Sequence, residues 1–354
     1  MSNDIGDILI IGAGAIGGAT SAILYKNNID VTLLSRKSEH YDKVKKDGLT
    51  IKGIDEIFKV PIFSDIKKLN KKYKHILVTT KNLETEDAVK NISTVLTNNS
   101  LVYSMQNGFG NTDIIAKYIP RKQIVAGVVG WGANRTQLGE ITITSSTGDF
   151  VIGFENEKSI GNPDLLDIQK KLNLWKPTII TDNILGYRWS KLIVNSVVAP
   201  MGGLLGITLG EQLKNPRVVN VIRSIKEEGV NVAKALNIKL EKVDNLDVKL
   251  FFYKPQSEDR FFARMKNKTV SSIIAKIGAK RHGKIRSSLL WDLEHKRKTE
   301  IDFLNGYIVK KGLEIGVKVS ANAFLVKAIH EIENGKRKIG MHNLDDLEKV
   351  VSSS

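Results

Sequence analysis

Short apolar runs alternate with amphipathic segments along the first half of the chain. The runs that predict strands are residues 7–12, 30–35, 75–80, 101–105 and 123–131, and the segments that predict helices are residues 15–27, 85–96 and 110–118. Strands and helices that alternate in this way are typical of a doubly wound parallel sheet with helices on both faces. The sequence therefore predicts an N-terminal α/β domain of the Rossmann type.

The pattern changes in the second half of the chain. Residues 139–153 alternate apolar and polar side chains, which predicts a hairpin whose turn is Thr147-Gly148. From about Asn183 to Gly335 the pattern is helical almost throughout, and the residues after Gly340 are polar. We therefore predict an α/β domain at residues 1–183, an all-helical domain at residues 184–340, and a polar tail at residues 341–354 that frays.

The composition narrows the class of protein. The 354 residues include no cysteine, which excludes disulfides, thiolate metal sites and cysteine nucleophiles, and we expect no metal site. We expect no signal peptide, because the N-terminus is acidic and the apolar run after it is short. The uncharged run at 192–210 contains Asn195, Pro200 and several glycines, so it indicates a buried helix and a turn rather than a membrane span. We expect a cytoplasmic protein without a membrane partner.

The net charge of +16 raises the question of a polyanionic partner. Residues 254–286 hold ten Lys or Arg against two acids, Glu258 and Asp259, so this segment supplies half of the net charge. A nucleic-acid-binding protein would carry a recognised module beside such a segment, and the sequence contains none. We therefore expect a solvated basic face, which could flank the entrance for an anionic ligand, and no specific nucleic-acid site.

Gly12, Gly14 and Gly17 form a G-x-G-x-x-G pattern directly after the first predicted strand, with Ala15 and Ile16 between the last two glycines. In this position the glycines allow a tight turn, close approach of a pyrophosphate and close contact between helix and strand. The N-terminus of the following helix attracts phosphate groups. The sequence therefore predicts that residues 12–17 bind a dinucleotide.

The second predicted strand ends in Ser35, Arg36 and Lys37, with no carboxylate at its tip. An acid at this position would bind the 2′-hydroxyl of NAD and repel a 2′-phosphate. Hydroxyl, guanidinium and ammonium groups instead suit the additional phosphate of NADP. We therefore predict NADP(H) as the cofactor, with Ser35 and Arg36 among its contacts. The alternative is that these residues are surface cations without a ligand.

Two more polar groups follow predicted strands. Lys81 comes after the strand at 75–80, and Asn107-Gly108 come after the strand at 101–105. Ligands of open parallel sheets bind outside the carboxyl ends of the strands, so both groups are expected to reach cofactor or substrate. For Asn107 an ordinary Asn-Gly turn is the alternative.

The helical part of the chain contains further candidates. Lys191 and Asn195 are four residues apart in an apolar segment, so on a helix they project from the same face. Such a lysine either extends its ammonium group to water or is held inside for chemistry. Glu300 falls near a core-facing position, where a carboxylate is more often a capping or salt-bridging group than a catalyst.

Taken together, these motifs resemble the ketopantoate reductase family. The resemblance rests, in chain order, on Gly12-x-Gly14-x-x-Gly17, Lys81, Asn107-Gly108, Trp189-x-Lys191-Leu192-x-x-Asn195, Ser287-Ser288 and Thr299-Glu300-Ile301-Asp302-x-x-Asn305-Gly306. It extends from about Ile8 to residue 335. It implies an NADP-binding Rossmann domain, a C-terminal helical domain and an active site in the cleft between them. It also implies reduction of the ketone of 2-dehydropantoate to pantoate, a step toward coenzyme A.

The resemblance assigns roles by position. It implies a catalytic role for Lys191 and Glu300, substrate contacts for Asn107, Asn195 and Ser288, and cofactor contacts for Arg36, Lys81 and Asn107. Hydride addition to a ketone leaves an alkoxide that needs a proton and a positive neighbour. An ammonium group on a rigid helix supplies both, so we interpret Lys191 as the general acid.

The chain departs from the family pattern at two substrate-recognising positions. Ala199-Pro200 replaces the Asn-Pro of the family, and Leu209 stands where a further asparagine is expected. We expect NADPH-dependent reduction of a 2-oxo acid, with 2-dehydropantoate as the first candidate. A paralogue that reduces a different 2-oxo acid or ketone is one alternative, and a non-catalytic NADP-binding regulatory protein is another. The apolar face of the final helices could serve a homodimer.

Overall fold

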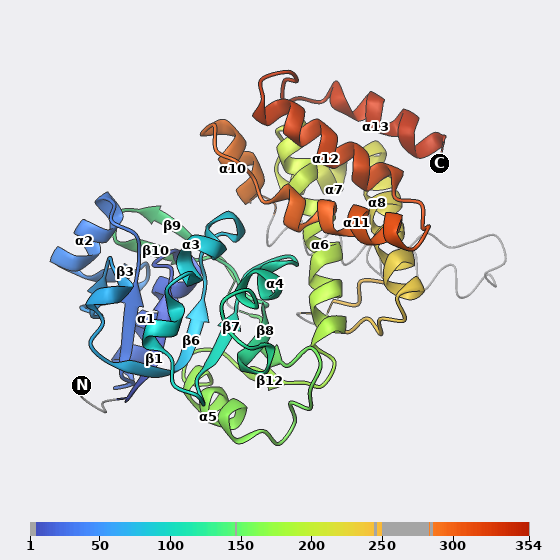
Figure 1. Cartoon of the computed structure of the whole chain (residues 1–354). Helices are drawn as coiled ribbons and strands as arrows, with labels where there is room; N and C mark the ends of the chain where they lie inside the picture. Colours follow the sequence, from blue (N-terminus) through green and yellow to red (C-terminus); the bar gives the residue numbers. More distant parts are fainter. Residues whose placement is uncertain (1–4, 146, 244–245, 250–282, 284–285, 354) are drawn as a thin grey trace. The chain divides into compact units, whose positions relative to one another are not determined.

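The structure is a computed structural model that describes residues 5–145, 147–243, 246–249, 283 and 286–353. The chain forms two compact units, Met1–Arg188 and Trp189–Ser354 (Figure 1). The helix α6 (Ile184–Leu205) begins in the first unit and continues in the second. The boundary that we propose after residue 183 lies at the start of this helix, whereas the two compact units divide after Arg188. The basic stretch at 254–286 lies almost entirely outside the described residues.

The first unit is built on an eight-stranded sheet with the strand order β12-β11-β8-β7-β6-β1-β2-β5. Neighbouring strands are parallel except for β8 and β11. The strands are β1 (Ile5–Ile11), β2 (Val31–Leu34), β5 (Ile62–Phe63), β6 (Lys72–Val78), β7 (Leu101–Ser104), β8 (Ile124–Val129), β11 (Phe150–Gly153) and β12 (Thr178–Ile180). The central strands are continuous apolar runs because both faces of the sheet are covered. The strand order reverses between β1 and β6, which is where sheets of this kind bind their ligands.

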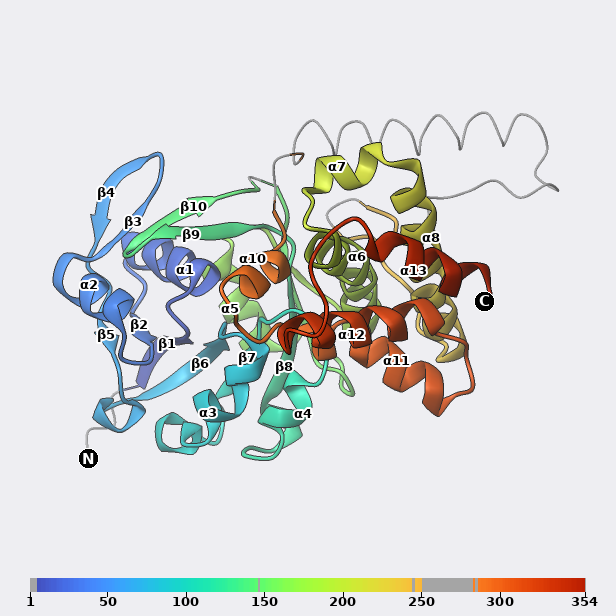
Figure 2. The ribbon, with the colours of Figure 1, turned by 90° about the horizontal axis from the view of Figure 1, so that it is seen from above.

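Helix α1 (Ala15–Lys26) lies between this sheet and a second, four-stranded sheet with the order β4-β3-β10-β9 (Figure 2). The strands of the second sheet are β3 (Leu49–Ile51), β4 (Ile54–Phe58), β9 (Ala133–Gln137) and β10 (Glu140–Ile143). A Cβ atom at Gly18 would lie only 2.6 Å from the Ile141 side chain, so the lack of a side chain there permits the close packing. The fold class predicted from the sequence, an α/β domain followed by a helical domain, is confirmed.

The predicted hairpin at residues 139–153 is wrong. Strand β10 pairs with β9 and β3 in the small sheet, whereas β11 pairs with β8 and β12 in the large sheet. Between them the chain passes against Gly130, whose N–H donates to the carbonyl oxygen of Asp149 over 2.8 Å. Gly148 has a φ of +104° and lies against the same glycine, so it directs the chain into the large sheet instead of closing a turn.

The remaining helices of the first unit are short. They are α2 (Glu39–Asp47), α3 (Thr85–Val89), α4 (Asn111–Ile115) and α5 (Pro163–Leu172), with 3₁₀ turns η1 (Ile66–Lys68), η2 (Asn82–Glu84), η3 (Ile92–Val95) and η4 (Arg121–Gln123). The helix predicted at 85–96 is interrupted because Asn91 leaves the helical conformation. The helix predicted at 110–118 begins after Gly110, which is left-handed, and spans little more than one turn.

The second unit is helical in its described part. Its elements are α6, α7 (Leu209–Lys214), α8 (Pro216–Ala235), α10 (Ser288–Glu294), η5 (Ile301–Phe303), α11 (Asn305–Glu314), α12 (Ser320–Glu333) and α13 (Asn343–Ser352). Apolar side chains of α6, α8, α10, η5, α12 and α13 form one core. Every helix of the described residues falls short of the length or the apolarity of a membrane span.

Helix α6 contains a proline, which removes one hydrogen bond from the helix. Pro200 has no N–H, so the carbonyl group of Ser196, one turn earlier, lacks its usual helical donor. The side chain of Asn305, at the start of α11, donates to this carbonyl oxygen over 3.0 Å. Asn305 is fully buried. The asparagine of the Asn305-Gly306 motif therefore completes the helix that carries Lys191.

Residues 341–354, predicted as a frayed polar tail, instead contain α13. Leu344 and Leu347 are one turn apart and fully buried in the core of the second unit. The side chain of Asn343 donates to the carbonyl oxygens of Leu204 and Gly340, both over 3.0 Å. These two leucines, with the half-buried Val351, pack this helix against the core although most of its residues are polar, which is why a polar composition misled the prediction.

Candidate functional site

The glycine loop joins β1 to α1 at the switch point of the large sheet. Gly12 has a φ of +111°, a conformation that favours glycine. A Cβ atom at Gly17 would overlap the carbonyl oxygen of Gly12 and the hydroxyl group of Thr79. Gly14 is the N-cap of α1, and a Cβ atom there would meet nothing within 4 Å in the described part of the chain.

The N-terminus of α1 fits a dinucleotide phosphate. No side chain of the described residues caps it, and its first turn, which includes Ala15 and Ile16, contains no acid. Its first N–H groups therefore lack a side-chain acceptor among the described residues, and the positive end of the helix dipole lies beside Gly14. A pyrophosphate would supply the acceptors that a capping side chain supplies in other helices.

Two residues that the sequence analysis missed support this loop. The Thr79 hydroxyl donates to the carbonyl oxygens of Ile11 and Gly12, over 3.0 and 2.9 Å. His40 is buried; its Nε2 lies 2.8 Å from the carbonyl oxygen of Ala13, and its Nδ1 accepts from the N–H of Gly139. Burial lowers the pKa of His40, so the ring is neutral and Nε2 donates. A lone histidine in a polar segment carries no signal of this role in the sequence.

Ser35 and Arg36 follow β2, as predicted. The Arg36 side chain is 74% exposed, and its Nη1 lies 2.8 Å from Oε1 of Glu84 in η2. The guanidinium group is thus available at the surface, but it already has an acidic partner. A 2′-phosphate bound by Arg36 would have to compete with this carboxylate.

Lys81 and Asn107 lie in adjacent loops at the carboxyl edge of the sheet, and both are exposed. These loops are joined by hydrogen bonds. The Asn82 side chain donates to the carbonyl oxygen of Asn107 over 2.9 Å, and the Gln106 side chain donates to that of Thr80 over 3.0 Å. The first unit therefore brings the glycine loop, Lys81 and Asn107 to one edge of the sheet, as the sequence predicted.

Arg188 is a further residue that the sequence analysis left without a role. It is 5% exposed, forms an ion pair with Glu155, and donates to the carbonyl oxygen of Gly108 over 3.3 Å. Its guanidinium carbon lies 4.1 Å from the ring centre of Phe109. Arg188 therefore fixes the loop that carries Asn107. An arginine beside a tryptophan at the start of a long apolar helix was the available signal.

Lys191 and Asn195 lie on the accessible face of α6. Most of this helix is buried, including Leu192, Ile193, Ser196 and Val197, but one stripe along it is half-buried. The members of this stripe are Lys191, Val194, Asn195, Val198 and Ala199. The lysine and the asparagine therefore share an accessible face, and the alanine that replaces a family asparagine lies on the same face.

Ser288 and Glu300 belong to the second unit as well. The Ser287 hydroxyl caps α10 by accepting from the N–H of Leu290 over 3.0 Å, and Ser288 is exposed. Glu300 immediately precedes η5 and is half-buried, whereas its neighbour Ile301 is fully buried. Glu300 therefore lies next to a core-facing position, which Ile301 occupies.

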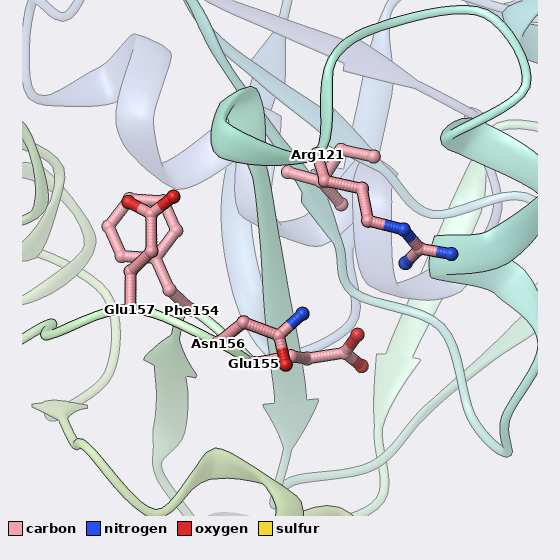
Figure 3. A pocket seen from close by; sticks show the side chains of 6 residues that line it. Arg121, Phe154, Glu155, Asn156 and Glu157 are labelled. Atoms are coloured by element: carbon pink, nitrogen blue, oxygen red, sulfur yellow. The ribbon is translucent and has the colours of Figure 1, made fainter.

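The first unit also has a small surface pocket that is separate from the predicted site residues. Side chains from η4, from the start of β8 and from the segment after β11 line it (Figure 3). Arg121, Phe154, Asn156 and Glu157 are among them, together with Glu155. None of the predicted site residues contributes to this pocket, so we assign it no part in the chemistry.

The doubly wound sheet, the uncapped helix behind a glycine loop and the separate helical unit define a Rossmann-type dinucleotide-binding protein. The family model described as Ketopantoate reductase PanE/ApbA matches residues 8–157, and the model of the C terminal part of the same family matches residues 183–333. The chain therefore belongs to the ketopantoate reductase family and is an oxidoreductase.

Individual relatives agree with this placement. A protein of Archaeoglobus fulgidus named 2-dehydropantoate 2-reductase is 27% identical over 331 residues, which are 93% of this chain and 98% of that protein. A ketopantoate reductase of this family from Ralstonia eutropha superposes with a TM-score of 0.76 at 24% identity, covering 94% of this chain and 100% of that one. A D-mandelate dehydrogenase with NADH and anilino(oxo)acetate gives a TM-score of 0.76 at 23% identity, covering 93% and 99%. These two structures share the fold of the chain.

Proposed function

We propose that this chain reduces a 2-oxo acid to the 2-hydroxy acid with NADPH, and that 2-dehydropantoate is the first candidate substrate. The observation that carries the proposal is the half-buried stripe of α6, which places Lys191 and Asn195 on one face of a mostly buried helix. Membership of the ketopantoate reductase family supports it. An assay of NADPH oxidation with a panel of 2-oxo acids tests it, and no turnover with any of them would contradict it.

The proposed roles follow from the chemistry of ketone reduction. When bound at residues 12–17, the nicotinamide cofactor supplies the hydride. The ammonium group of Lys191 stabilises the developing alkoxide and donates a proton to it. Asn195, one turn along α6, orients the substrate or the lysine. Asn107 and Ser288 offer an amide and a hydroxyl group to the substrate.

The carboxylate of Glu300 completes the proposed site. It accepts a hydrogen bond from a substrate hydroxyl group or from the ammonium group that takes part in the proton transfer. A regulatory protein that only binds NADP would need neither this carboxylate nor the lysine. Their joint presence favours an enzyme over a sensor.

Cofactor choice is the first prediction of this proposal. Replacement of Arg36 by alanine is expected to weaken NADPH binding by about tenfold or more, because a charge-assisted hydrogen bond to the 2′-phosphate is lost, and to leave NADH binding nearly unchanged. Fluorescence titration with both cofactors measures the two affinities. Lys43→Ala removes an exposed cation of α2 that is paired with Asp47, and it is the matched control. Equal losses for both cofactors would show that Arg36 does not read the phosphate.

Substrate choice is the second prediction. A pocket amide that bonds a substrate hydroxyl group discriminates by up to about 10⁴-fold against an analogue that lacks it. Ala199 and Leu209 present only apolar groups. We therefore expect kcat/KM for 2-dehydropantoate to exceed that for its deoxy analogue 2-oxoisovalerate by much less than this factor. A ratio near the upper figure would mean that other residues read the hydroxyl group. A preference for apolar 2-oxo acids would favour the paralogue reading.

A further inference from the structure

Two side chains of α12 hold the segment that carries Glu300. The N–H and the hydroxyl group of Thr299 both donate to Oε1 of Glu333, each over 2.7 Å. On the other side of Glu300, Oδ1 of Asp302 lies 2.9 Å from Nε2 of His330. His330 and Glu333 are also joined, because Nδ1 of the ring lies 2.9 Å from Oε2 of the carboxylate. Residues 299 and 302 are therefore held by one connected pair of side chains.

Glu333 occupies an unfavourable position for a carboxylate. Its side chain is 5% exposed, and it is the last residue of α12, where the helix dipole is negative. Burial raises its pKa, but hydrogen bonds from Thr299 and His330 outweigh burial and lower the pKa below its ordinary value. The carboxylate is thus kept ionised by the groups that it holds. A buried charge of this kind is costly without its partners.

The geometry of His330 favours a charged ring. A neutral imidazole has one N–H and could donate to only one of the two carboxylates, whereas an imidazolium donates to both. In the described part of the chain, the charged groups that act on this ring are Glu333, on its own helix, and Asp302, on η5. Burial alone lowers the pKa of His330, but the hydrogen bonds to these two acids outweigh it and raise the pKa above its ordinary value.

We propose that His330 and Glu333 are positioning residues for the reaction. As an ion pair they hold residues 299–302 in place, so that Glu300 presents its carboxylate to the substrate. This hold weakens when His330 loses its proton. The inference rests on the proposed function, because it takes Glu300 as part of the active site. Neither residue needs to touch the substrate. The imidazolium donates a hydrogen bond to both Asp302 and Glu333, whereas the neutral ring can donate to only one of these two acids.

The pH dependence of turnover tests the proposal. Wild-type kcat/KM is expected to fall by about tenfold between about pH 6 and about pH 9 as the hold on residues 299–302 weakens, since small misplacements of catalytic groups are costly. His330→Gln should have, at every pH, the low kcat/KM that the wild type reaches at about pH 9, and its pH profile should lack the fall that is due to His330. His330→Arg, which stays charged and can donate to both acids, should restore the higher value and keep it at alkaline pH. Any change in kcat/KM with pH that is due to the titration of Lys191 should persist in the wild type and in both His330 variants.

The control and the second readout separate this proposal from a purely structural role. His342 is an exposed histidine of the same unit, and His342→Gln should leave the profile unchanged. The titration of the His330 ring, followed by nuclear magnetic resonance, should shift to lower pH in Asp302→Asn and in Glu333→Gln. A wild-type pH profile in His330→Gln would overturn the proposal. So would an equal loss at every pH, with the inflection retained and the melting temperature lowered.

The same experiment distinguishes the failure of the proposed function. An inactive wild-type protein whose His330 titration still depends on Asp302 and Glu333 would contradict the reductase assignment and, with it, the role in catalysis, although the contacts themselves would stand. An active wild-type protein whose His330 titration ignores both acids would overturn the positioning role alone.

Discussion

Replacement of Lys191 by alanine is expected to lower kcat by about a hundredfold or more, because the reduced ketone would lose its proton donor and its positive neighbour. NADPH affinity should change little, since we propose that residues 12–17 bind the phosphates and that Lys191 acts on the substrate. Steady-state kinetics with the best 2-oxo acid, together with a cofactor titration, measure both quantities.

A second variant separates the charge of Lys191 from its proton. Lys191→Arg keeps a positive group on the accessible stripe of α6 but holds its proton too tightly to donate it. It should recover substrate binding, seen in KM, without recovering kcat. Lys234→Ala, an exposed lysine of α8, is the matched control and should behave as the wild type. Turnover of Lys191→Ala at the wild-type rate would make the lysine a structural residue.

The second large effect is expected in the glycine loop. Gly17→Ala should destabilise the protein by about 3 kcal/mol or more, because its Cβ atom would overlap the Gly12 carbonyl and the Thr79 hydroxyl, and one of these is backbone. Gly14→Ala is the matched substitution. Its Cβ atom would meet no described atom within 4 Å, and its φ of −74° suits alanine, so the fold should tolerate it.

The two alanines should therefore separate folding from cofactor binding. Gly17→Ala should lower the melting temperature, whereas Gly14→Ala should keep it and lose dinucleotide affinity, because the added methyl group occupies the space that the pyrophosphate approaches. Thermal denaturation and fluorescence titration with NADPH measure these properties. Wild-type NADPH affinity in Gly14→Ala would contradict the placement of the phosphates beside this glycine.

The elements that the sequence predicted well are those whose signals are local. A buried parallel strand is a continuous apolar run, and the glycine loop is defined within six residues of sequence, Gly12 to Gly17. The 3.6-residue period likewise indicated the helical half. In each case the residues whose pattern predicts the element are the same residues whose contacts form it.

The elements that the sequence could not predict depend on distant partners. The alternation at 139–153 correctly predicts two strands. However, β10 pairs with β3, at residues 49–51, and β11 pairs with β8, so the two strands do not pair with each other. Periodicity gives the faces of a strand and says nothing of its neighbour. The same limit applies to the site: Arg188 reaches Gly108 and His40 reaches Gly139, across long stretches of chain.

The repair of α6 by Asn305 has a consequence for how such chains diverge. Loss of Asn305 while Pro200 remains would leave the buried Ser196 carbonyl without a donor, at a cost of about 1–3 kcal/mol. Loss of Pro200 first would restore the ordinary helical donor and leave the amide of Asn305 with its other partner, Asn322. Substitutions at these two positions are therefore expected to occur in a fixed order, with Pro200 replaced before Asn305. Descendants that have abandoned the asparagine should, as a rule, have abandoned the proline before it.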